Sequence, residues 1–232
     1  MRKRRKHFYY FFILILLILY LFLEIFLPGV VEKRVKSEIK NYSEDVSNLE
    51  VSVNAFPAWN LIFSRADRID INADYINLDG LLLRDISAQY EDIIIDNGEI
   101  KGNNTNLKIN ISEKNLNQYI NNHYNDLGDF EINLNPGQVF MKGDISILNT
   151  SISLQLNGKF MLVSPNEIKF NPTNIKIENL TISEDLIREY IKDFGFSFNL
   201  SDLNFPINVE KIKVENDELK LMGGIFVRKA ES

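Results

Sequence analysis

An apolar run near the N-terminus constrains this chain more than any other feature. Residues 8–27 supply the roughly 20 residues that a helix, rising about 1.5 Å per residue, needs to cross a hydrocarbon core of about 30 Å. Glu24 is the one charged residue in the run, and we interpret it as a boundary residue that reaches water. Five basic residues precede the run: Arg2, Lys3, Arg4, Arg5 and Lys6. Because basic flanks stay in the cytoplasm, we expect a cytoplasmic tail (1–7), a transmembrane anchor (8–27) and an extracytoplasmic remainder.

A cleaved signal peptide is the alternative interpretation of the same run. Cleavage requires a small-x-small site after the apolar segment, whereas residues 24–28 read Glu-Ile-Phe-Leu-Pro. We therefore favour a single-pass protein of the cell membrane with its domain outside.

Composition limits the partners of the exported part. Without the five basic residues and Glu24 of the N-terminal segment, 21 basic and 31 acidic residues remain, so we expect no nucleic-acid partner. Long-range attraction to anionic headgroups is equally disfavoured, and any lipid contact must come from apolar surface or a local basic patch. Cysteine is absent, so a core must stabilise the fold without disulfides.

The region after the anchor has the pattern of a short amphipathic helix. Val31, Val35, Ile39 and Tyr42 fall at helical spacing among charged residues, and Pro28 is a typical helix start. We predict a juxtamembrane segment at 28–48 that packs on the domain or lies along the headgroups. The folded domain then occupies 49–232.

From Leu49 the apolar residues alternate with period two, which predicts half-buried strands. Asn97-Gly98, Asn135-Pro136-Gly137 and Asn216-Asp217 separate apolar segments and predict tight turns. The long crossover helices of parallel sheets are missing from this pattern. We therefore predict an α+β fold with a long, curved, antiparallel sheet.

Two capped helices interrupt the strands, one after Ser112 and one after Ser183, the second ending at Gly195. Each follows a similar strand, and the segments after them match at a constant offset of 80 residues, for example Ile132 with Ile212. We predict an internal duplication in which the sheet wraps around both amphipathic helices.

Residues for nucleophilic or metal chemistry are scarce. The two histidines, His7 and His123, lie on opposite sides of the expected membrane, and cysteine is missing. The carboxylates Asp67, Asp70, Asp74, Asp79 and Asp85 are spread along alternating strands without a calcium-loop spacing. We expect no enzyme activity, no metal and no cofactor, and interpret these carboxylates as a solvated sheet face.

A sheet wrapped around two apolar helix faces can leave a trough that suits acyl chains. The candidate lining residues lie on the apolar faces of the two helices: Leu116, Tyr119, Ile120, Leu186, Tyr190, Ile191 and Phe194. The same periodicity is equally typical of a closed core, in which these side chains only contact each other.

Aromatic residues are concentrated at 56–63, between two predicted strands. Phe56, Trp59 and Phe63 are candidates for the membrane interface, where aromatic side chains are enriched. Packing against the core is the alternative.

The order of these segments resembles the LmeA family of phospholipid-binding proteins, which lie outside the cytoplasmic membrane of actinobacteria, cyanobacteria and Gram-positive relatives. The resemblance spans about Val30 to Val227 and rests on residues 51–53 with Pro57 and Leu61, on 69–73, on 78–83, on the turn at 97–98, and on the Ser112 helix with the Gly143 hairpin, repeated once. It implies a fold like tubular lipid-binding domains, in which a curved sheet wraps a helix and leaves an apolar channel. It also implies phospholipid binding and a role in the cell envelope. The acidic body departs from the basic entrance expected for anionic lipid, which leaves the headgroup open.

These observations favour a membrane-anchored phospholipid-binding protein, a carrier or sensor, over two alternatives. One is a structural or protein-interaction module of the envelope with a closed core. The other is an envelope enzyme that uses dispersed carboxylates, which the missing nucleophiles and metal ligands disfavour.

Overall fold

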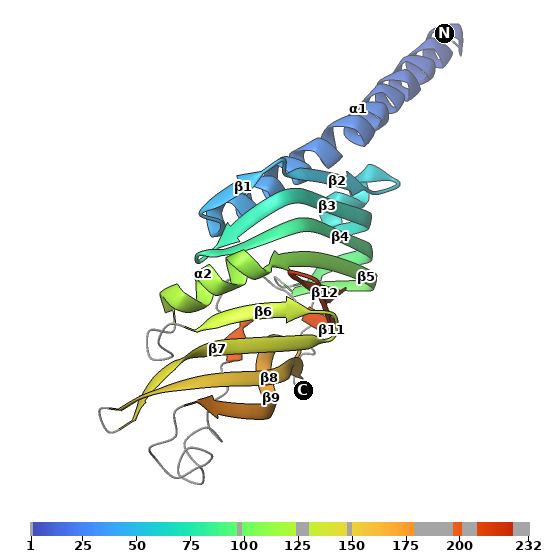
Figure 1. Ribbon diagram of the computed structural model, residues 1–232. Helices are drawn as coiled ribbons and strands as arrows, with labels where there is room; N and C mark the ends of the chain where they lie inside the picture. The colour runs from blue at the N-terminus through green and yellow to red at the C-terminus, as the bar shows by residue number, and fades with distance from the viewer. Residues whose placement is uncertain are drawn as a thin grey trace.

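A long N-terminal helix, α1 (Arg2–Tyr42), leads into two antiparallel sheets (Figure 1). The computed structural model describes residues 2–96, 99–123, 130–147, 150–178, 197–200 and 208–224. The elements that follow α1 are, in order, β1 (Asp45–Ser47), β2 (Glu50–Asn54), the 3-10 helix η1 (Ala58–Phe63), β3 (Arg65–Leu78), β4 (Leu81–Asp96), β5 (Glu99–Ser112), α2 (Glu113–His123), β6 (Glu131–Asn135), β7 (Gln138–Ile147), β8 (Thr150–Ser164), β9 (Glu167–Glu178), β10 (Ser197–Asn199), β11 (Asn208–Glu215) and β12 (Glu218–Gly224).

The first sheet has seven strands in the order β1-β3-β4-β5-β12-β11, with β2 also paired to β3. The second sheet has five strands in the order β10-β9-β8-β7-β6. Each of these strand pairs is antiparallel, which confirms the predicted sheet type. The prediction of one long sheet needs correction, because β6–β10, which follow α2, form a sheet of their own, and β11 and β12 return to the first sheet.

Hydrogen bonds between hairpin turns join the two sheets. The Gly137 N–H of the β6–β7 turn donates to the Val214 carbonyl at 3.0 Å, and the Asp217 N–H of the β11–β12 turn donates to the Leu134 carbonyl at 3.1 Å. Gly137 (φ +73°) and Asp217 (φ +57°) both have left-handed backbone, as tight hairpin turns require. Both predicted turns are therefore present, and each turn donates a hydrogen bond to the other hairpin.

The two hairpins also share a register. Ile132 pairs with Met141 in β6–β7, and Ile212 pairs with Leu221 in β11–β12, which is the same pairing displaced by 80 residues. The internal duplication itself stays a prediction, because the second capped helix at 183–195 lies outside the described residues. The first helix, α2, is present where it was predicted.

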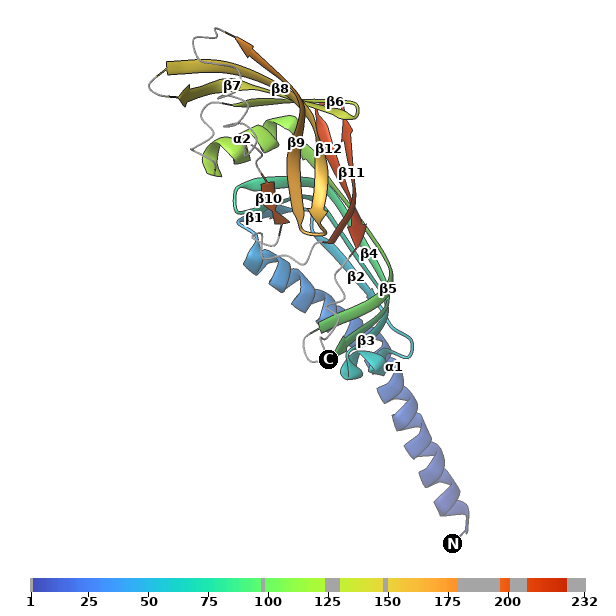
Figure 2. The ribbon, with the colours of Figure 1, turned by 90° about the horizontal axis from the view of Figure 1, so that it is seen from below.

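β-Bulges bend the first sheet. Asp85 and Asp92 in β4 have φ of +48° and +52°, and the pairing of β4 with β5 shifts register beside both residues. A bulge adds a residue to one strand and increases its local bend. Figure 2 shows the curvature of β4 and β5 that results.

The helix α1 does not end at the expected membrane boundary. Pro28 lies inside it, so the juxtamembrane helix that we expected to begin at Pro28 is instead the C-terminal part of one continuous helix. Val31 and Val35 pack against the core, and Ile39 is buried within it. Tertiary packing of this face stabilises the helix past Pro28, which cannot donate a backbone hydrogen bond. The apolar segment 8–27 and the helical part that packs on the domain therefore belong to one helix.

Alternation of buried and exposed residues follows the predicted pattern. In β2, Val51 and Val53 are buried, whereas Glu50, Ser52 and Asn54 are exposed. The buried strand residues of both sheets form one hydrophobic core together with α2 and the end of α1.

Candidate functional site

The helix α2 carries three of the predicted lipid-binding residues, and its start has a clear local cause. The Asn115 N–H donates to the Ser112 hydroxyl at 3.3 Å, so Ser112 caps the helix as predicted. Glu113 occupies the first turn, where a carboxylate interacts favourably with the positive end of the helix dipole.

The apolar face of α2 lies fully inside the domain. Leu116 and Ile120 are 0% and 1% exposed, and Tyr119 is 6% exposed. All three belong to the core shared by the two sheets. Their role in lipid binding stays a prediction, and the other four candidates, Leu186, Tyr190, Ile191 and Phe194, lie outside the described residues.

The polar face of α2 has a role that the sequence did not indicate. The Asn117 side chain accepts a hydrogen bond from the Ile132 N–H at 2.7 Å and donates one to the Ile132 carbonyl at 2.8 Å. Glu113 accepts the Leu134 N–H at 2.6 Å. Because β6 is an edge strand of the second sheet, these side chains take the place of a neighbouring strand.

The far end of α2 holds His123, one of the two histidines of the chain. His123 stacks on Tyr119 with ring centroids 4.2 Å apart, and its Nδ1 lies 3.0 Å from the Tyr119 carbonyl. Its Nε2 lies 3.5 Å from a carboxylate oxygen of Asp79, in the β3–β4 turn. This arrangement tethers a turn to a helix.

The dispersed carboxylates of the first sheet each have a local partner. Asp67 accepts the Phe56 N–H at 2.6 Å, Asp70 pairs with Arg68 at 2.7 Å, and Asp74 accepts from Asn48 at 2.5 Å. Among the residues that the structure describes, no group of three or more His, Asp or Glu side chains is placed to hold a metal ion.

An open pocket of about 660 Å³ lies where the two sheets meet. Its lining comes from the β6–β7 turn, β8 and β11: Pro136, Gly137, Lys159, Phe160, Ile212, Lys213, Val214, Glu215 and Asn216. The volume falls within the range of roughly 300–1,000 Å³ that is typical of small-molecule sites. The three predicted lipid-binding residues that the structure describes, Leu116, Tyr119 and Ile120, do not line it, so sequence reasoning missed this pocket.

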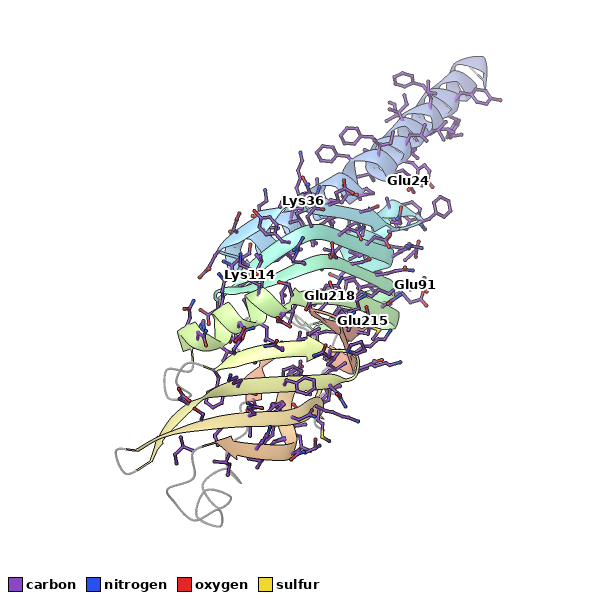
Figure 3. The ribbon with its side chains drawn as sticks, viewed as in Figure 1. Glu24, Lys36, Glu91, Lys114, Glu215 and Glu218 are labelled. Carbon is purple, nitrogen blue, oxygen red and sulfur yellow. The ribbon has the colours of Figure 1, made fainter. Side chains whose placement is uncertain are left out.

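Lysines surround Glu215 at one side of this pocket. Its carboxylate lies 2.6 Å from the Lys213 amine and 2.7 Å from the Lys220 amine. These hydrogen bonds lower the pKa of Glu215 from 4.5 to about 2. Glu215 and Glu218 lie together on the β11–β12 hairpin (Figure 3).

The aromatic segment 56–63 forms an exposed projection. Phe56, Trp59 and Phe63 are 75%, 46% and 71% exposed, and Ile62 is 62% exposed. We call this segment, Phe56–Phe63, the apolar tip. The segment is therefore largely outside the core, and its membrane role stays a prediction.

The apolar tip lies against α1. The Ala58 N–H donates to the Glu24 carboxylate at 3.0 Å, and Trp59 makes an edge-to-face contact with Tyr20 at 5.7 Å. Glu24 sits where α1 leaves the domain (Figure 3). We expected Glu24 only to reach water at the boundary, but the structure gives it a specific backbone partner.

Within α1, residues Tyr9–Tyr42 contain a stretch that is long and apolar enough to cross a membrane. Aromatic and aliphatic side chains are exposed along it, with Tyr10 at 68% and Ile25 at 82%. Exposure of so many apolar residues is typical of a transmembrane helix or of a signal sequence.

One comparison with known proteins found a match. The family model of LmeA-like phospholipid-binding proteins matches residues 23–224. Comparisons with curated proteins and with solved structures found no match. The matched range begins beside Glu24 and covers both sheets and α2.

Proposed function

Since this chain belongs to the LmeA-like phospholipid-binding family, we propose that it is a membrane-anchored, extracytoplasmic phospholipid-binding protein that acts without catalysis as a carrier or sensor in the cell envelope. The family match, which covers both sheets and α2, is the observation that carries this proposal. Residues 8–27 anchor the chain in the cytoplasmic membrane, and the basic residues before them keep the N-terminus inside.

We place the acyl chains in an apolar groove between the sheets and the helices, lined by the faces of α2 and of the segment 183–195. Leu116, Tyr119 and Ile120 project into the interior that the two sheets share, which supports this position. Transfer of each methylene from water is favourable by about 0.8 kcal/mol, so a dozen methylenes contribute on the order of 10 kcal/mol before ordering costs. Apolar burial alone is then enough to hold a lipid.

The pocket between β8 and β11 supports the same proposal from another side. It lies at the junction of the sheets and combines the apolar side chains of Phe160 and Ile212 with the cationic Lys159, beside the ion pair of Lys213 and Glu215. Apolar tails and an anionic phosphate are complementary to these apolar and cationic side chains.

Photocrosslinking tests where the tails lie. The full-length chain is reconstituted in vesicles that contain a phospholipid with a photoreactive acyl chain, and the crosslinked peptides are identified by mass spectrometry. We expect crosslinks to the peptides that contain residues 116–120 and 186–194. Crosslinks confined to α1 and the apolar tip would contradict an interior groove.

A pair of variants separates lipid loading from folding. Ile191→Asp places a charge on the proposed groove, whereas Val163→Asp places one on an exposed position of β8, where Val163 is 59% exposed. We expect Ile191→Asp to reduce the interior crosslinks more than it reduces thermal stability. Equal loss of both would favour an ordinary core position.

The burial of α2 favours a second candidate function. Leu116 and Ile120 are closed off from solvent, and the pocket between the sheets lies elsewhere. A structural or protein-interaction module of the envelope requires only such a filled core. If no peptide after residue 63 is crosslinked, the result would favour this module.

A further inference from the structure

The apolar tip points to a second contact between this protein and the bilayer. Phe56, Ile62 and Phe63 are each more than 60% exposed, although their side chains are large and apolar. The sequence has no charged residue between Glu50 and Arg65. In a water-exposed loop this composition is costly, whereas an interface between headgroups and acyl chains accommodates it.

The position of the tip along α1 indicates how deep the tip would lie below the outer end of the expected span. Trp59 contacts Tyr20, which precedes Leu27, the outer end of the expected span, by seven residues. At about 1.5 Å per residue this level is roughly 10 Å inside the outer end of the span. Interfacial apolar segments bury their side chains by about 5–10 Å, so the two depths agree.

Backbone N–H groups in and beside the tip have hydrogen-bond partners within the protein, as an environment with little water requires. The Phe56 N–H donates to Asp67, and the Ala58 N–H donates to Glu24. The Asn60 and Ser64 N–H groups donate to the Pro57 and Leu61 carbonyls within the 3-10 turn. Backbone donors that lack partners are costly in hydrocarbon, and these four donors have partners in the protein.

Glu24 connects the tip to the anchor. It lies one helical turn after Tyr20, which contacts Trp59, and its carboxylate accepts the Ala58 N–H at 3.0 Å. An acidic side chain near the end of an apolar span is costly unless it has such a donor. Glu24 therefore acts as a positioning residue that fixes η1 against α1.

We infer that the apolar tip inserts into the outer leaflet of the bilayer that α1 spans, so that the domain is held at the membrane by two contacts. The occupant of this surface is the lipid bilayer, because the surface is continuous with the anchor that reaches it. The inference rests on the proposed membrane anchoring, and it does not require that an acyl chain enters the core.

The single tryptophan, Trp59, reports directly on the tip. The full-length chain is reconstituted in phosphatidylcholine vesicles, with a nitroxide placed on the headgroup, near the glycerol end of the acyl chain, or near its methyl end. We expect the nitroxide near the glycerol end to quench most of the Trp59 emission, and aqueous iodide to quench little. Strongest quenching from the headgroup, or free access of iodide, would overturn the inference.

Two variants test the tip itself, with a matched control elsewhere. Phe63→Asp places a charge on the tip, so we expect less quenching by the acyl-chain nitroxide and more by iodide. Val163→Asp changes another exposed apolar residue, in the second sheet, and we expect no change in Trp59 quenching. If Phe63→Asp and Val163→Asp give the same quenching as the unchanged chain, the tip does not insert.

The two proposals fail separately. Quenching of Trp59 without interior crosslinks would support insertion of the tip and contradict the groove. Interior crosslinks with an iodide-accessible Trp59 would support the groove and overturn insertion.

Discussion

Replacement of Asn117 by alanine measures how much the polar face of α2 contributes to the fold. Ile132 is fully buried, and its outward N–H and carbonyl are hydrogen-bonded to the Asn117 side chain at 2.7 and 2.8 Å. Alanine removes both partners, and a buried polar group without one costs about 1–3 kcal/mol. Alanine also has a better helix propensity than asparagine by roughly 0.6 kcal/mol. Two such groups, less the gain in helix propensity, lead us to expect that Asn117→Ala lowers the free energy of unfolding by about 1–5 kcal/mol.

Urea unfolding of the full-length chain in detergent, followed by circular dichroism, gives this difference. Asn121→Ala is the matched control, because Asn121 lies on the same helix and is exposed. We expect this control to leave the stability unchanged or to raise it by about 0.6 kcal/mol, the difference in helix propensity. Hydrogen exchange should also show faster exchange of the Ile132 amide in Asn117→Ala alone. Equal stability of the two variants would refute the role of Asn117 at the sheet edge.

Two further predictions follow from contacts in the second sheet and beside it. In Gly158→Ala, the new Cβ would clash with the Asn171 carbonyl oxygen and approach the Phe170 ring to 2.8 Å, so we expect a loss of about 1–3 kcal/mol in thermal unfolding. Gly29→Ala is the control, because a Cβ at that position meets no atom within 4 Å. Glu215, whose pKa of about 2 is below its ordinary 4.5, favours the folded state above about pH 4.5, and this contribution is lost as the pH falls towards 2. Carboxyl titration by NMR should show the low pKa, and Lys220→Met should raise it; an ordinary pKa in the unchanged chain would contradict the ion pairs.

Sequence reasoning succeeded where short-range chemistry determines the structure. The Ser112 cap predicted the start of α2, and Asn135-Pro136-Gly137 predicted the β6–β7 turn. Period-two alternation predicted the buried face of β2. Each of these features depends on residues within a few positions of each other, so the local sequence is enough to predict it.

The division into two sheets depends on long-range contacts that no local pattern records. The polar face of α2 reads as a solvated helix face, because Asn117 and Glu113 have the spacing of ordinary surface residues. Their partners, Ile132 and Leu134, lie beyond the end of the helix on β6. A polar residue that covers a sheet edge cannot be told from one that faces water until the fold is known.

The candidate lipid site shows the same limit. Periodicity predicted correctly that Leu116 and Ile120 point inwards. It could not separate a lined groove from a filled core, because both place apolar residues on the same helix face. The pocket between β8 and β11 was missed, because its lining comes from a turn and two strands that are distant in sequence.

The helix α1 connects the proposed anchor directly to the first sheet. Besides Glu24 and Ala58, it places the Glu32 carboxylate 3.0 Å from the Val53 N–H, at the outer edge of β2. A carboxylate that accepts a hydrogen bond from an edge strand replaces, at that position, the acceptor that a neighbouring strand would supply. Because one helix carries both the apolar segment and the carboxylate that binds the edge of β2, the domain is joined to that segment without a loop. With residues 8–27 in the membrane, as we propose, the domain would stay beside the bilayer, which favours short-range lipid transfer or sensing at the outer leaflet over transport across a wide space.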